Sequence, residues 1–130
     1  MAAVVQQADQ QATQQKYDDA VKTYDQAVRG YMLLALATKQ TTLDPGVDSV
    51  MHNAGQAAQK GGEQAQTMLS TLLNDVLTFD PDDKTANMEL AQLSLHQSPP
   101  DYSTAADLEE RAGAPDAEVK KLRAEAKRHH

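Results

Sequence analysis

The sequence lacks cysteine and has few aromatic side chains. Without cysteine, disulfide bonds, thiol chemistry and metal sites built from thiolates are excluded, and the chain suits a reducing compartment. Only four tyrosines and one phenylalanine are present. Alanine, leucine, valine and methionine must therefore supply most of the packing, which favours close helix–helix contact over a sheet. We expect a single all-α domain over residues 1–130.

The sequence also lacks an excess of basic residues and long apolar runs. Its 19 acidic and 12 basic side chains give a net charge of −7, so neither nucleic acid nor acidic lipid is expected as a partner. The longest apolar stretch, MLLALA at 32–37, is too short to span a membrane. The N-terminal MAAVVQQADQQ has no basic segment typical of a signal peptide. We expect a soluble, intracellular, cytoplasmic protein without membrane insertion.

What the chain does contain is a repeated stripe of tyrosine and alanine. The stripe consists of Tyr17, Ala20, Tyr24, Ala27 and Tyr31. Spacings of three and four place these residues on one face of a helix, where we assign Tyr17 and Tyr24 to packing. Residues 102–112 repeat the pattern, with tyrosine first and alanine three and ten residues later. The recurrence predicts repeated helical hairpins, which bind other proteins more often than they catalyse reactions.

Proline, glycine and aspartate divide the chain into seven predicted helices. These span 2–14, 17–38, 45–60, 63–78, 83–97, 102–112 and 116–128. Asp44–Pro45 and the acidic run at 80–83 are typical of capped helix starts, where proline's missing N–H does no harm. Gly61–Gly62 interrupts the helical pattern. The last helix has few apolar positions, so we expect it to cap one end of the fold.

The segment KYDDAVKTYDQAV resembles the second-helix signature of the tetratricopeptide repeat family. LLNDVLTFDPDD resembles the end of one such repeat, and ELAQLSLHQSPPDYSTAADLEERA resembles most of the next. The resemblance implies repeats at about 1–38, 47–80 and 81–114, followed by a capping helix at 115–128. It further implies three antiparallel helical hairpins stacked as a short right-handed superhelix.

The first 38 residues also resemble a microtubule-interacting-and-trafficking domain. That three-helix module has a similar tyrosine–alanine pattern and a long second helix. Here the second helix continues through MLLAL, at 32–36, where the repeat pattern would end. This second resemblance implies binding of amphipathic helices in the grooves between helices, and it stays open as an alternative.

The repeat resemblance implies a concave groove, lined by the first helix of each hairpin, that holds a peptide or helix of a partner. The implied groove positions are Val5, Asp9, Met88, Gln92 and His96. We therefore expect a non-enzymatic interaction module, either a scaffold or an adaptor subunit. A small helical ligand-binding protein is a further alternative, and it would need a deep apolar pocket with convergent polar groups.

No pattern of reactive side chains indicates a catalytic, metal or cofactor site. His52 and His96 lack the paired helical spacing that a zinc site needs. The acidic run at 80–83 lacks the glycine and distal glutamate of a calcium loop. The acidic run at 107–110 is interpreted as a solvated helix face.

Overall fold

In the computed structural model, which describes residues 2–129, the chain forms seven α-helices and no strand. The helices are α1 (Ala2–Thr13), α2 (Tyr17–Ala37), α3 (Gly46–Lys60), α4 (Glu63–Phe79), α5 (Lys84–Leu95), α6 (Tyr102–Arg111) and α7 (Asp116–Arg128). The all-α prediction is confirmed, and every helix boundary lies within two residues of its predicted position. Met1 and His130, the two ends of the predicted domain, lie outside the described residues.

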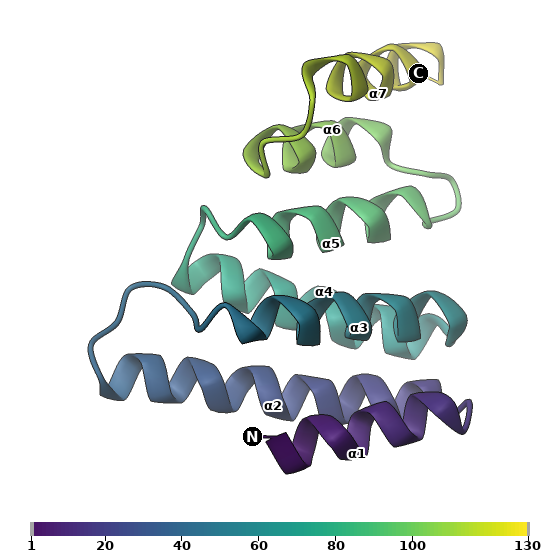
Figure 1. Ribbon diagram of the computed structural model, residues 1–130. Helices are drawn as coiled ribbons and strands as arrows, with labels where there is room; N and C mark the ends of the chain where they lie inside the picture. The colour runs from purple at the N-terminus through teal and green to yellow at the C-terminus, as the bar shows by residue number, and fades with distance from the viewer. Residues whose placement is uncertain (1, 130) are drawn as a thin grey trace.

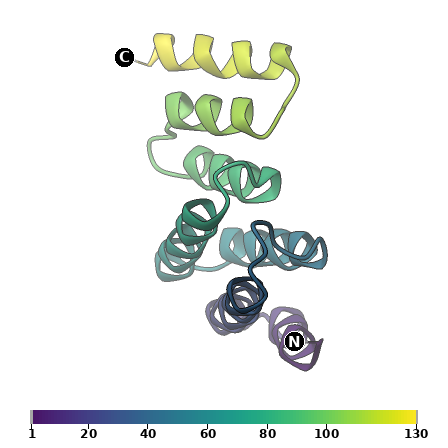
Figure 2. The ribbon, with the colours of Figure 1, turned by 90° about the vertical axis from the view of Figure 1, so that its left-hand side faces the viewer.

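Successive helices cross the molecule in alternating directions and pack in chain order (Figure 1). Helix α1 packs on α2, α3 packs on α4, and α5 packs on α6. Helix α2 also contacts α3 and α4, while α5 contacts both α3 and α4. The result is an elongated stack with α1 at one end and α7 at the other (Figure 2).

Aspartate side chains cap the N-termini of two helices, α5 and α6. The Asp83 carboxylate accepts a hydrogen bond from the backbone N–H of Ala86 at 2.9 Å, and Asp101 accepts one from Thr104 at 3.1 Å. These bonds satisfy amide donors that the first helical turn leaves without partners. The predicted capped start of α5 is therefore confirmed. Between α6 and α7, Gly113 adopts a φ of +81°, in the left-handed region that glycine tolerates best.

The large apolar core residues lie on α2, α3 and α4. The bulkiest fully buried apolar side chains are Tyr24, Met51, Leu69, Leu72 and Leu73. On α5, α6 and α7, the bulkiest fully buried side chains are the polar Asn87 and Glu109. Packing by large side chains is therefore uneven along the stack.

Tyr24 joins α2 to α1. Its ring is buried, and its hydroxyl donates a short hydrogen bond to the Asp9 carboxylate. Burial first, and then this acidic partner, raises the pKa of Tyr24. The packing role predicted for Tyr24 is confirmed, whereas Tyr17 is only half-buried against the core.

The last turns of α2 leave apolar side chains on the surface. Leu33, Leu34 and Leu36 are between 57% and 68% exposed. They belong to the apolar stretch that continues α2 beyond the tyrosine–alanine stripe. Among the described helices, none combines the length and the apolar character needed to cross a membrane.

Helices α4 and α6 both contact α5, but within the described residues they do not contact each other. Helix α5 lies between them in the stack (Figure 2). One face of α5 is therefore left uncovered between its two neighbours, and a groove lies there.

Candidate functional site

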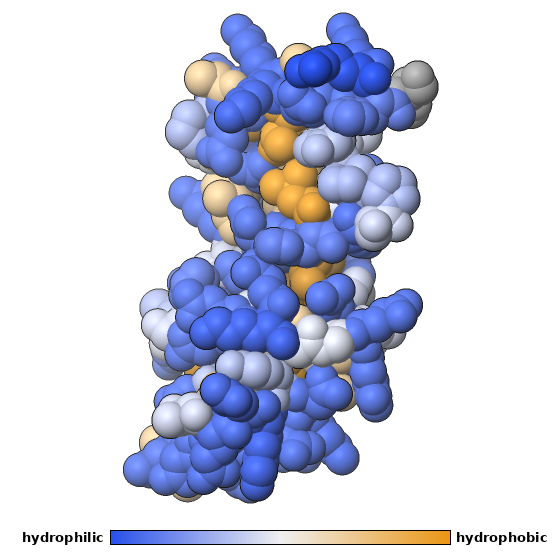
Figure 3. Space-filling model, turned by 90° about the vertical axis from the view of Figure 1, so that its right-hand side faces the viewer, coloured by the Kyte–Doolittle hydropathy of each residue, from blue (hydrophilic) through white to orange (hydrophobic). Residues whose placement is uncertain are grey.

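A depression crosses α4, α5 and α6, and we call it the α4–α6 groove. Its volume is about 890 Å³, and it also reaches the connection between α5 and α6. It opens on the side of the molecule where α4 begins and α5 ends, which is the right-hand side of Figure 1. Figure 3 views that side and shows apolar surface at the bottom of a recess, bordered by hydrophilic side chains.

Three leucines form the floor of the α4–α6 groove. Leu90 and Leu93 are three residues apart on α5 and so share a helix face, and Leu108 comes from α6. Each is 8% exposed, so each reaches the groove while most of its surface packs inside the protein. A floor of this kind is suited to the apolar side chains of a bound segment.

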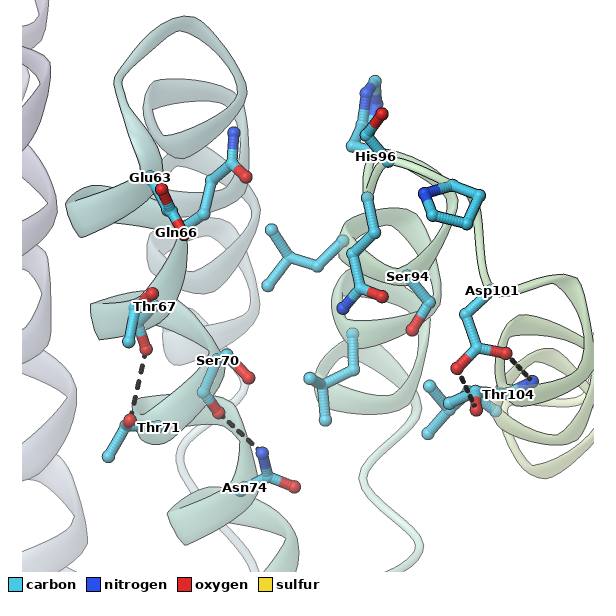
Figure 4. Close-up of a pocket in the computed structure, with 16 residues that line it drawn as sticks. Glu63, Gln66, Thr67, Ser70, Thr71, Asn74, Ser94, His96, Asp101 and Thr104 are labelled. Atoms are coloured by element: carbon cyan, nitrogen blue, oxygen red, sulfur yellow. Dashed lines mark hydrogen bonds between the residues drawn. The ribbon is translucent and has the colours of Figure 1, made fainter.

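Polar side chains at three- and four-residue spacing form the α4 wall of the groove. These residues are Glu63, Gln66, Thr67, Ser70, Thr71 and Asn74. The Thr71 hydroxyl donates to the Thr67 carbonyl at 3.1 Å, and the Asn74 amide donates to the Ser70 carbonyl at 2.9 Å (Figure 4). The Thr71 hydroxyl and one N–H of the Asn74 amide are therefore already bonded within α4, whereas the oxygen atoms of both side chains can still accept hydrogen bonds.

Asp101 stands at the α6 side of the groove, held by two hydrogen bonds from Thr104. The Thr104 backbone N–H donates at 3.1 Å and its hydroxyl at 2.7 Å (Figure 4). These bonds lower the pKa of Asp101, so its carboxylate is ionised at neutral pH. Glu63 adds a second, exposed carboxylate from α4, and no lysine or arginine lines the groove. The α4–α6 groove therefore carries negative charge.

A second groove, of about 660 Å³, lies between α3 and α5, and we call it the α3–α5 groove. Met88 and Gln92 line its α5 side, and His52 and Gln56 line its α3 side. The repeat prediction made α3 and α5 the first helices of successive hairpins, so this groove lies on the face that was expected to bind a partner.

A buried carboxylate lies at the base of the α3–α5 groove. Glu89 is 8% exposed, and its Oε2 atom is 3.3 Å from Nδ1 of His52. Burial raises the pKa of Glu89, and the neighbouring imidazole opposes that change. The carboxylate also lies directly against α3, because a Cβ atom built on Gly55 would be 1.9 Å from Oε1 of Glu89. Glu89 therefore occupies space that only a glycine at position 55 leaves free.

The five predicted groove residues are not brought together in one depression. Met88 and Gln92 share the α3–α5 groove, whereas His96 lines the α4–α6 groove. Val5 is half-buried on α1 and packs against the core, and the Asp9 carboxylate binds the Tyr24 hydroxyl. The polar face of α4 was not among the predicted positions. Its regular hydroxyl and amide spacing, opposite the apolar face of α4, was the signal that could have indicated it.

The interpretation of the acidic run at 107–110 as a solvated face is wrong for its two central residues. Leu108 is 8% exposed and Glu109 is completely buried. The two outer residues, Asp107 and Glu110, do lie at the surface, where they form ion pairs with Arg123 of α7 at 3.0 and 2.5 Å. Two neighbours explain the difference. Leu108 belongs to the core cluster that also contains Leu90 and Leu93 of α5. Glu109 lies beside Glu118 of α7, which packs on α6.

Neither carboxyl oxygen of Glu109 has a hydrogen-bond partner among the described residues. Burial, reinforced by the nearby Glu118 carboxyl group on α7, raises the pKa of Glu109 to about 7. The folded chain therefore favours the protonated form of this side chain.

Within residues 2–129, no three histidine, aspartate or glutamate side chains are grouped so that they could hold a metal ion. Comparison of the chain with protein-family models, with curated proteins and with solved structures finds no match. The geometry of the two grooves is therefore the basis for any functional conclusion.

Proposed function

We propose that this chain is a non-enzymatic interaction module, an adaptor or scaffold subunit that holds a segment of a partner protein in the α4–α6 groove. The observation that carries the proposal is the solvent-open leucine floor between polar walls. Interfaces typically combine an apolar centre with a polar rim in this way. We also propose that the protein works in a reducing compartment such as the cytoplasm, which the absence of cysteine supports.

The fold we propose is a short array of the tetratricopeptide type, with three antiparallel hairpins in a right-handed superhelix and α7 as the cap. The pairing of α1 with α2, α3 with α4 and α5 with α6 supports it, as does the contact between α3 and α5. The trafficking-domain alternative is less well supported. Helix α2 packs on α4 as well as on α3, so the first three helices do not stand apart from the rest.

A binding role is also supported by how the groove side chains are used. Asp101 caps α6, and Thr71 and Asn74 bond within α4. These groups hold the shape of the walls and are not arranged around a reacting centre. The groove is open along its length and has polar walls, which suits a polypeptide segment better than an enclosed small molecule.

The test is affinity capture from the cells that make this protein, with two charge-matched double variants. Thr67→Arg/Ser70→Arg places bulky cations in the α4 wall, and Gln56→Arg/Gln59→Arg places them in the α3–α5 groove. Arginine is a better helix former than threonine or serine and about equal to glutamine, so both variants should stay folded, as circular dichroism would verify.

We expect proteins retained by the parent chain to be retained by Gln56→Arg/Gln59→Arg and lost from Thr67→Arg/Ser70→Arg, as quantified by mass spectrometry. Equal retention by both variants would remove the α4–α6 groove from the proposal. Loss from the α3–α5 variant alone would move the binding site to the face predicted from the sequence.

A further inference from the structure

The α4–α6 groove presents two carboxylates, which only accept hydrogen bonds, among uncharged hydroxyl and amide groups. The Thr71 hydroxyl and one N–H of the Asn74 amide donate within α4, and Thr104 donates its backbone N–H and its hydroxyl to Asp101. The carboxylates of Glu63 and Asp101 accept hydrogen bonds only, and no lysine or arginine is present to balance them. The groups that best complement such walls are cationic donors, which are the side chains of lysine and arginine.

The walls are helices, and this determines the backbone conformation that an occupant needs. The backbone groups of α4, α5 and α6 are bonded within their own helices, so the groove offers no strand edge to an extended peptide. An extended segment over the leucine floor would leave its own N–H and C=O groups without partners there. A helix satisfies those groups internally and presents only side chains to the floor.

The length of the α4 wall indicates how long a docked helix can be along the groove. The wall runs from Glu63 to Asn74, which corresponds to ~16 Å at 1.5 Å per residue. About three turns of a docked helix match this length. Such a helix would place two or three apolar side chains, at spacings of three and four, on Leu90, Leu93 and Leu108.

We infer that the occupant of the α4–α6 groove is a short basic amphipathic helix of a partner protein. Its apolar stripe lies on the three leucines, and its lysine or arginine side chains reach Glu63 and Asp101. This inference rests on the proposed function and adds to it the chemistry of the partner segment.

Labelled peptides of about 14 residues serve as probes, with binding followed by fluorescence anisotropy. The first carries leucines at helical spacing and lysines at both ends. The second replaces the lysines with glutamates. The third has the composition of the first with a central proline, which prevents a continuous helix. The protein is the full chain, its Glu63→Gln/Asp101→Asn variant and a matched Asp82→Asn/Asp116→Asn control, which removes the same charge outside the groove.

We expect the lysine peptide to bind at least about tenfold more tightly than the glutamate peptide, with an affinity that falls as salt is added. Glu63→Gln/Asp101→Asn should weaken it by about threefold to tenfold, because partly exposed ion pairs contribute modestly. The charge-matched control should remain within about twofold of the parent chain. Asparagine at position 101 keeps the α6 cap, so this variant should stay folded.

Three results would overturn the inference. The first is equal binding of the lysine and glutamate peptides, the second is an equal loss in both charge variants, and the third is equal binding of the proline peptide. If Thr67→Arg/Ser70→Arg nevertheless abolished binding of every peptide, the groove would stand as the binding site and only the partner chemistry would be wrong. Sedimentation of the protein alone would reveal a second copy as the occupant, if Glu63→Gln/Asp101→Asn dissociated a dimer.

Discussion

At the residue scale, Glu109 makes the stability of the fold depend on pH. Its carboxyl group is completely buried, and its pKa of about 7 lies above the ordinary value of 4.5. The folded chain therefore binds this proton more tightly than the unfolded chain. The resulting stabilisation is fully present below pH 4.5 and is lost as pH rises to about 7.

Glu109→Gln should remove that dependence, because glutamine has nearly the same shape and does not ionise. We expect the parent chain to lose on the order of 3 kcal/mol of unfolding free energy across this pH window through Glu109. Urea denaturation at pH 5 and pH 8 would measure the loss in the parent and in the variant. Glu110→Gln, at the exposed neighbouring position, should keep the slope of the parent chain. An unchanged slope in Glu109→Gln would show that the buried carboxyl group does not carry the effect.

At the scale of helices, the packing of α5 on α3 depends on a position without a side chain. A Cβ atom at Gly55 would overlap the Glu89 carboxylate, so Gly55→Ala must displace it from its place beside His52. We expect Gly55→Ala to destabilise the fold by about 1–3 kcal/mol. Thermal and urea denaturation would measure the change.

In a Glu89→Ala background, Gly55→Ala should instead stabilise the fold. Without the carboxylate there is no overlap, and alanine is the better helix former by up to about 1 kcal/mol. The difference between the two backgrounds is a coupling free energy, as in a double-mutant cycle. If Gly55→Ala had the same effect in both backgrounds, the close contact would not be what determines the packing of α3 and α5.

The helices themselves could be predicted because the signals that define them are local. Apolar stripes, Asp83 before α5 and Gly61–Gly62 between α3 and α4 all lie within a few residues of the boundary they set. The α4–α6 groove could not be predicted in this way. It exists because α5 separates α4 from α6, and that separation depends on packing between residues far apart in the chain. The burial of Glu109 could not be predicted for the same reason, because it depends on the packing of α7 against α6.

At the scale of the whole molecule, the packing is strong in α2–α4 and weak at the α7 end of the stack. The large, fully buried apolar side chains lie on α2, α3 and α4, whereas the corresponding residues of α5 and α6 are Asn87 and Glu109. Helix α7 contacts only α6 among the described helices. The ion pairs of Arg123 lie at the surface, where such pairs contribute little to stability. In a stack of this kind each helix pair depends mainly on its neighbours, so the weak end can open without the rest.

Amide hydrogen exchange should therefore show a gradient along the chain. We expect the most protected amides of α2–α4 to exchange only through global unfolding, and those of α6 and α7 to open at a free energy at least about 1 kcal/mol lower. After correction for intrinsic exchange rates, the gap should widen from pH 5 to pH 8, because ionisation of Glu109 destabilises the α6–α7 contact. Glu109→Gln should keep the gap constant over the same range. Uniform protection from α2 to α7 would instead mean that the seven described helices unfold as one cooperative unit, and the uneven core would then have no consequence for local opening.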